Sequence, residues 1–242
     1  ALVLSRQMLE RVRSLPSVAA ASIVNRALLR GTGRKASIAP AGESVGRDDF
    51  LNCSTNSVEP GYFETMGMRL IAGRNFTSFD RNQRKPTKVI VNQASVRRFF
   101  PNENPIGRRL GMGAPGTVAA PDMEIIGVVS DAKYRSLREG IPPTVYGLME
   151  SGFQYGFTLY IRTHQRPEAI IGSVREVLRS LDPELPFVEV HTLRQEVETS
   201  LWQERLLAVL SSIFGAIALL VASIGLYGAL DYSVKARTRE IG

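Results

Sequence analysis

An uninterrupted run of 25 uncharged residues, Leu206 to Leu230, constrains this 242-residue chain more than any other feature. At a rise of about 1.5 Å per residue, a helix of that length would measure about 37 Å, whereas a bilayer's hydrocarbon core is about 30 Å thick. The alternative, a buried core helix of a soluble protein, is usually shorter. The run therefore predicts a membrane-spanning helix at residues 204–230, with a larger region at 1–203 and a tail at 231–242.

Residues at the two ends of the run indicate its orientation. Side chains suited to the headgroup layer flank it: Trp202, Arg205, Tyr227 and Tyr232. The tail then adds Lys235, Arg237 and Arg239. By the positive-inside rule the tail is cytoplasmic, and residues 1–205 lie outside the cytoplasm. Small residues four apart, at 211/215 and 218/222, are a weak indication of neighbouring membrane helices.

The formal net charge of +7 fits a surface that binds nucleic acid, one that binds anionic lipid, or one that only contacts solvent. The basic residues occur in scattered pairs, such as Arg97-Arg98 and Arg108-Arg109, with few aromatic residues between them. Nucleic-acid surfaces usually interleave the two. We therefore expect a solvated surface near membrane lipid and no nucleic-acid partner. The single cysteine, Cys53, permits no internal disulfide.

Catalytic and ligand-binding patterns are scarce. Residues 111–116, GMGAPG, match G-x-G-x-x-G, but Pro115 and the residues after it do not begin a helix, so a loop between strands is expected. No P-loop pattern occurs, and His164 and His191 have no partners at metal-ligand spacing. The glycosylation patterns at Asn52 and Asn75 are treated as incidental. We predict no catalytic, cofactor-binding or metal residues, no cofactor, and no enzyme activity.

Local patterns predict alternating helices and strands in residues 1–203. Pro60 and Gly67 bracket a short helix, Asn92 caps another, and Thr192 with Gln195 begins a helix that continues into the apolar run. Further helices are expected at 4–15 and 167–181. Strands are expected at 18–24, 50–58, 88–91, 108–112, 124–130, 157–161 and 186–190, with a loop at 30–49 and a turn at 102–107.

Four stretches resemble the periplasmic core domain of MacB-like ABC transporter permeases. They are VEPGYFETMGMRLIAGRNF at 58–76, VIVNQASVRRFFPNENPIGRRL at 89–110, EIIGVVSDAKYRSLR at 124–138 and PPTVY at 142–146. Residues 204–234, followed by RTREIG at 237–242, resemble the first membrane helix of an FtsX-like permease region. The order of these stretches is that of the family, and the pattern is most similar to the duplicated permeases of acidobacteria.

This resemblance implies a fold and a division into lobes. The fold would be a two-lobed α+β (α/β) periplasmic domain with one C-terminal transmembrane helix. A porter-like lobe would comprise residues 1–68 and 147–203, and an inserted smaller lobe residues 69–146. The chain would begin after an upstream membrane helix and end before the remaining permease helices and their ATPase-coupling loop.

The resemblance also implies a function. A separate ATP-binding subunit would hydrolyse ATP, and the permease would couple this to export or mechanical signalling across the bacterial inner membrane. Further partners would be a second permease half or protomer, membrane lipid, and a periplasmic adaptor or cargo. Two alternatives stay open: a single-anchor periplasmic sensor or binding protein, and a membrane-anchored enzyme. Hydrophobic segments encoded on both sides of the chain would favour the permease.

Overall fold

The structure is a computed structural model that describes residues 2–27, 34–47, 50–81, 85–132, 140–149, 157–182 and 190–240. The chain divides into two units, residues 1–192 and 193–242, and each is described by itself. The first unit contains a mixed sheet with helices α1 (Leu2–Arg13), α2 (Tyr62–Met66), α3 (Gln93–Phe99) and α4 (Pro167–Leu181). The second contains the single helix α5 (Leu193–Glu240).

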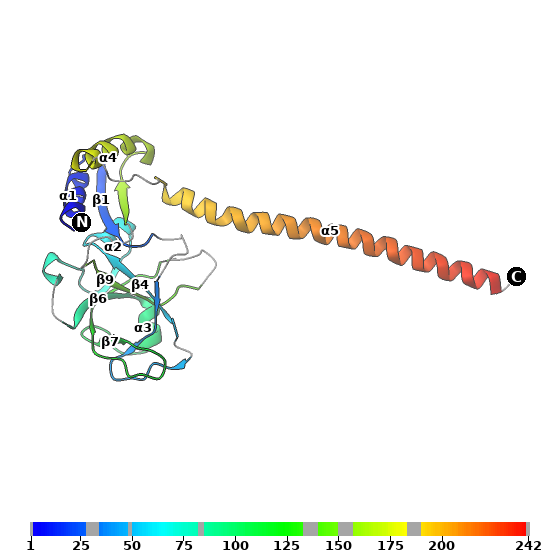
Figure 1. Cartoon of the computed structure of the whole chain (residues 1–242), viewed down its shortest axis with the longest axis horizontal. Coiled ribbons are helices and arrows are strands. Elements are labelled where there is room, and N and C mark those ends of the chain that lie inside the picture. Colours follow the sequence, from blue (N-terminus) through cyan, green and yellow to red (C-terminus); the bar gives the residue numbers. More distant parts are fainter. Residues whose placement is uncertain are drawn as a thin grey trace. The chain divides into compact units, whose positions relative to one another are not determined.

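The described residues form a ten-stranded sheet in the order β10-β1-β4-β9-β6-β8-β7-β3, with β2 paired to β4 and β5 paired to β8 (Figure 1). The strands are β1 (Val18–Val24), β2 (Arg34–Ala36), β3 (Ile38–Pro40), β4 (Cys53–Val58), β5 (Leu70–Gly73), β6 (Thr87–Asn92), β7 (Arg109–Met112), β8 (Met123–Val129), β9 (Thr144–Leu148) and β10 (Thr158–Thr163). Pairing is parallel between β4 and β9 and between β6 and β8, and antiparallel elsewhere.

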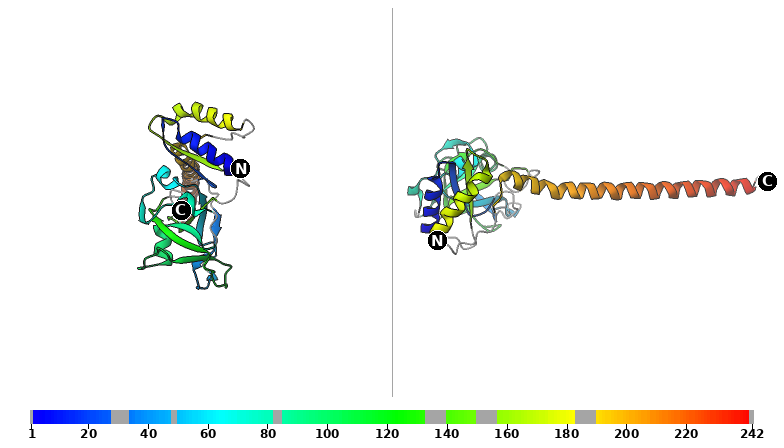
Figure 2. Two further views of the ribbon diagram at one scale, coloured as in Figure 1. Left: turned by 90° about the vertical axis from the view of Figure 1, so that its left-hand side faces the viewer. Right: turned by 90° about the horizontal axis from the view of Figure 1, so that it is seen from above.

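Helices α1 and α4 cover β1 and β10. The side chains that α4 buries, Ile170, Val174 and Leu178, recur every four residues and so share one helix face. They pack in one cluster with Met8, Leu9 and Val12 of α1 and with Ile23 of β1. Figure 2 shows the two helices side by side, and Arg11 of α1 donates a hydrogen bond to Ser180 of α4 at 3.1 Å. The helices predicted at 4–15 and 167–181 are therefore confirmed, the first with bounds shifted by two residues.

A second cluster surrounds the short helix α2. Tyr62 and Phe63 are buried against Tyr146 of β9, and the ring centroids of Phe63 and Tyr146 are 5.1 Å apart in an edge-to-face arrangement. A third cluster lies on β3, β6, β7 and β8 and contains Ile38, Val89, Leu110 and Ile125. Strand β8 is buried along almost its whole length, as its apolar sequence predicts.

Most predicted elements are found within a few residues of their expected bounds. The loop expected at 30–49 is wrong in part, because β2 and β3 lie within it. These three-residue strands carry no local alternation that would mark them. They form because β2 pairs with β4 and β3 pairs with β7, which is distant in sequence. The strand expected at 186–190 lies mostly outside the described residues.

Candidate functional site

Helix α5 contains an apolar segment long enough to cross a membrane, which is the most prominent functional feature of the described chain. It is continuous over 48 residues, so the predicted unbroken helix into the apolar run is confirmed. Its segment Leu207–Tyr227 has a mean hydropathy of 2.5, long and apolar enough by length and composition to cross a membrane, and none of it is buried. Large side chains such as Phe214 and Ile224 are exposed. The alternative of a buried core helix does not fit this exposure.

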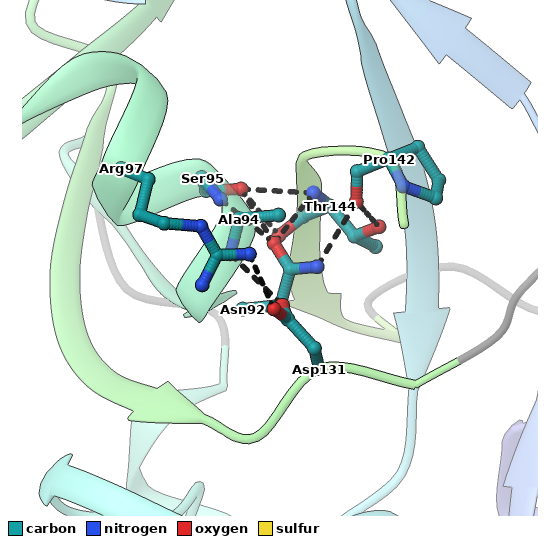
Figure 3. A network of polar contacts seen from close by, with 7 residues as sticks. All are labelled: Asn92, Ala94, Ser95, Arg97, Asp131, Pro142 and Thr144. Atoms are coloured by element: carbon teal, nitrogen blue, oxygen red, sulfur yellow. Dashed lines mark hydrogen bonds and ion pairs between the residues drawn. The ribbon is translucent and has the colours of Figure 1, made fainter. Parts of the chain in front are cut away.

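A polar junction centred on Asn92 joins three strand ends of the first unit (Figure 3). The side-chain oxygen of Asn92 accepts hydrogen bonds from the backbone N–H of Ser95 at 3.0 Å and of Thr144 at 2.9 Å. Its amide donates to the carbonyl of Pro142 at 3.0 Å. One buried side chain thus caps α3, as predicted from the sequence, and also holds the start of β9.

Asp131 extends this junction from the end of β8 (Figure 3). Its carboxylate accepts a hydrogen bond from the backbone N–H of Ala94 at 2.9 Å and contacts the Arg97 guanidinium at 2.6 Å. A carboxylate is favourable there because the first turn of a helix presents unsatisfied N–H groups. The contacts of Asn92 and Asp131 fix the relative positions of β6, β8, β9 and α3. The junction thus holds the backbone of these four elements in place, and its side chains form no reactive group.

Two ion pairs hold the segment that follows β5. Arg74 donates two hydrogen bonds of 2.7 Å to the buried carboxylate of Asp80, which also accepts from the backbone and hydroxyl of Thr77. These contacts, with the Arg74 hydrogen bonds the largest contribution, lower the pKa of Asp80 to about 2.

Arg81 forms the second ion pair, with the buried carboxylate of Glu59 between β4 and α2. One guanidinium nitrogen lies 3.0 Å from Oε1 of Glu59, and the same nitrogen donates to the carbonyl of Met149 at 3.2 Å. The pair therefore connects residues far apart in sequence, from the segment after β5 to the ends of β4 and β9. Sequence reasoning missed both ion pairs: Glu59 and Arg81 are 22 residues apart, and Arg74 and Asp80, six residues apart, lie in a segment with no helical spacing to relate them.

The residues considered for chemistry lie apart from any catalytic arrangement. Cys53 is buried, and desolvation raises the pKa of its thiol to about 12, which disfavours the reactive thiolate. His164 follows β10 and His191 precedes α5, and both are exposed. Within the described ranges, no group of three or more His, Cys, Asp or Glu residues could hold a metal ion.

The two weak motifs have structural explanations. Residues 111–116 lie at the end of β7 and in the connection to β8, as expected, and a side chain at Gly111 would collide with the carbonyl of Ala120. The Asn52 amide exchanges hydrogen bonds of 3.0 and 2.9 Å with the backbone of Ile38, and the Asn75 amide contacts Glu64. Both asparagine side chains are thus engaged within the fold.

A mixed α/β domain followed by an apolar helix defines this molecule as a membrane-anchored domain protein. The chain belongs to the MacB-like periplasmic core domain family, whose family model matches residues 3–179. A crystal structure of the periplasmic region of MacB from Actinobacillus actinomycetemcomitans has the same fold, with a TM-score of 0.51 and 18% identity over 73% of each chain.

Curated relatives are permease components of export systems. The chain is 29% identical over 207 residues to the macrolide export ATP-binding/permease protein MacB of Aggregatibacter actinomycetemcomitans. The aligned region covers 82% of this chain and 31% of that protein. It is 26% identical over 204 residues to the probable syringafactin export ATP-binding/permease protein SyfD of Pseudomonas syringae pv. syringae, covering 81% of this chain and 30% of that protein. The chain thus spans about a third of these relatives' length.

Proposed function

We propose that this chain is the extracytoplasmic domain and one membrane helix of an ABC transporter permease in the bacterial inner membrane. One observation carries the proposal: a domain of the MacB-like periplasmic core family is followed in sequence by a helix with a span-length apolar segment. The basic residues after that segment favour a cytoplasmic tail. The porter-like lobe would be residues 1–68 and 147–203, and the inserted lobe residues 69–146.

The proposed activity is mechanical coupling. A separate ATP-binding subunit hydrolyses ATP and shifts the membrane helices, and α5 carries that shift to residues outside the cytoplasm, for export or for signalling to an envelope partner. The continuity of α5 supports this role, since an unbroken helix resists bending better than a helix joined by a loop. A second permease half or protomer and membrane lipid would contact α5, and an adaptor or cargo would contact the domain.

ATP hydrolysis by purified components tests the proposal. Residues 1–242 should show no ATPase activity by themselves, because they contain no P-loop pattern. The ATP-binding subunit encoded beside this chain should co-purify with it from membranes and hydrolyse ATP at a rate that changes when the permease is present. Robust hydrolysis by the chain without that subunit, or no association between the two, would contradict the proposal.

A further inference from the structure

Residues 1–192 form one compact unit, but their buried side chains gather in separate clusters. In the helix-covered part, which comprises α1, β1, β10 and α4, one cluster joins all four elements. In the sheet part, which comprises α3 and the strands from β2 to β9, a second cluster joins β3, β6, β7 and β8. Figure 1 shows α1 and α4 at one end of this unit and α3 and β7 towards the other. These parts are defined by packing alone and are not the lobes proposed from the sequence.

The two parts share little strand pairing. β1 pairs with β10 along its length, and β4 pairs with β9 at five positions. Among the described residues, β1 and β4 are paired only where Val24 lies opposite Val58, with a backbone hydrogen bond of 2.9 Å on each side of this pair. A full ladder of hydrogen bonds resists rotation of one strand against the next, whereas a single pair of residues at the strand ends can serve as a pivot.

Apolar packing between the two parts is centred on the short helix α2. The ring centroid of Tyr62 lies 6.3 Å from that of Tyr160 of β10, and the centroid of Phe63 lies 5.1 Å from that of Tyr146 of β9. Burial of apolar surface is favourable but non-directional. The cluster around α2 therefore holds the two parts together without fixing the angle between them.

Arg81 makes directional contacts between the two parts. Its side chain, 11% exposed, pairs with the Glu59 carboxylate, which is 3% exposed, and donates to the carbonyl of Met149 at 3.2 Å. Both acceptors are anchored to the helix-covered part. The Glu59 N–H donates to the carbonyl of Ile23 in β1 at 2.9 Å, and the Met149 side chain is buried in the cluster with α1 and α4.

The segment that carries Arg81 is fixed to the sheet part. It follows β5, and the Arg74 N–H donates to the carbonyl of Ile126 in β8 at 3.0 Å. The Arg74 guanidinium pairs with Asp80, the residue before Arg81. Arg81 is thus held to β8 on one side and reaches the helix-covered part on the other.

Arg13, the last residue of α1, makes a second set of contacts at the same junction. Its Nε donates to the carbonyl of Ala21 in β1 at 2.9 Å, and its Nη2 donates to the carbonyl of Pro60, in the turn before α2, at 2.8 Å. A guanidinium is planar and its N–H groups point in fixed directions. It therefore restricts the angle between the groups that it joins, as apolar contacts do not.

We propose that the junction of β1 with β4 is a hinge between the helix-covered part and the sheet part, and that Arg81 and Arg13 hold it at one angle. The two parts move as one body while both guanidinium groups are in place, and rotate about the single strand pair when they are removed. Because α5 follows α4 in the sequence, a shift of α5 would reach the sheet part across this hinge. That use rests on the proposed function, whereas the hinge itself does not.

Double electron–electron resonance on the full chain in detergent micelles tests the hinge. Spin labels are attached to cysteines at Ser173 of α4 and Arg98 of α3, two exposed positions in different parts, in a Cys53→Ser background. The distance distribution between the labels reports the angle between the parts. Amide hydrogen exchange in β6 and β8 of the same samples reports whether the sheet part stays folded.

The decisive variants remove the guanidinium contacts and keep the side chains long. Arg81→Met combined with Glu59→Met leaves no lone charge buried, and should widen the distance distribution about twofold while exchange in β6 and β8 stays slow. Adding Arg13→Met should widen it further. Lys88→Met combined with Glu124→Met is the matched control, because it removes a partly buried ion pair within the sheet part and should leave the distribution narrow.

Four results would overturn the proposal. The unchanged chain already gives a broad distribution, so that nothing holds the hinge. The triple variant gives a distribution as narrow as that of the unchanged chain. The control variant widens the distribution as much as the triple variant does. Exchange in β6 and β8 accelerates in step with the widening, in which case Arg81 and Arg13 stabilise the whole unit and set no angle.

Discussion

Asp80 shows how one buried carboxylate organises a turn. It receives two hydrogen bonds from Arg74 and further bonds from Thr77, and its side chain is only 2% exposed whereas that of Arg74 is half exposed. The folded state therefore favours the ionised form more than the unfolded chain does. This stabilisation is fully present above the ordinary pKa of an Asp, about 4, and is lost as the pH falls through the folded pKa of about 2.

Asp80→Asn should lower the free energy of unfolding by about 2 kcal/mol at neutral pH, because it removes a buried charge that accepts several hydrogen bonds. The difference between the variant and the unchanged chain should shrink as the pH falls from about 4 to about 2. Urea unfolding at several pH values measures both effects. Asp122→Asn is the matched control, since Asp122 pairs with the exposed Lys85 and should contribute little. Equal pH profiles for the two variants would contradict the prediction.

Asn92 holds two strands and a helix with one side chain, so its loss should be costly. Asn92→Ala leaves the backbone N–H of Ser95 and of Thr144 without this acceptor, and should destabilise the first unit by about 2–3 kcal/mol. Chemical denaturation followed by circular dichroism measures this. Asn104→Ala, which removes one exposed bond to Ile106, should cost less than about 0.5 kcal/mol. Comparable losses at both positions would show that the junction has no special role.

At the scale of helices and strands, the sequence predicted those elements whose formation depends on residues close together in the chain. The α3 cap and the Pro167 start of α4 are encoded within a few residues, and the structure confirms both helices. The strands β2 and β3 have no such signal, because their pairing with β4 and β7 depends on the rest of the sheet. Sequence patterns therefore located the helices and several buried strands, and missed β2, β3, β5 and the buried central strand β9.

Helix α5 can be tested as a rigid element. Val197→Pro should remove one internal hydrogen bond and clash with the preceding turn, which costs about 3 kcal/mol and bends the helix. Spin labels at Arg194 and Ser211, on either side of the substitution, should report a shorter and broader distance distribution than the roughly 25 Å of a straight helix. Val197→Ala is the control.

The same variant addresses force transmission. If α5 couples the membrane helices to the domain, Val197→Pro should abolish the transport-dependent phenotype while the first unit resists proteolysis as before. A preserved phenotype alongside a bent helix and an intact first unit would show that α5 does not transmit force, and the single-anchor alternative would gain.

At the scale of the whole molecule, topology is the decisive property. Cysteines introduced at Ala114 and at Ala236 should differ in intact cells, with the first labelled by an impermeant thiol reagent and the second protected until the membrane is opened. Background labelling should be low, because Cys53 is buried with a raised thiol pKa. Cys53→Ser is the background control. Labelling of the tail position alone would reverse the orientation.

The candidate site was less predictable than the fold. A spanning helix is visible in the sequence because its signal is a continuous run, whereas the Glu59–Arg81 pair forms from residues that only the fold brings together. Pro60 and Gly67 were predicted to bracket α2; Gly67 is its C-cap, whereas the N-cap is Gly61, one residue after Pro60. Nothing in the sequence indicated that Arg13 would donate a hydrogen bond to the Pro60 carbonyl.

The parallel neighbours β4 and β9 have a consequence for how the chain acquires its structure. Contacts at this pairing, such as that between the Cys53 thiol and the Pro143 carbonyl, join residues 90 positions apart. Closing so large a loop costs entropy before any favourable contact is made, and parallel pairings of this kind slow folding. The pairing of β4 with β9 should therefore form after the segment from β5 to β8 has collapsed, and the packing of α1 and β1 on α4 and β10 closes a longer loop still, with Arg11 and Ser180 169 positions apart. Until β4 and β9 pair, their edges stay exposed, so newly synthesised chains depend on this pairing forming promptly.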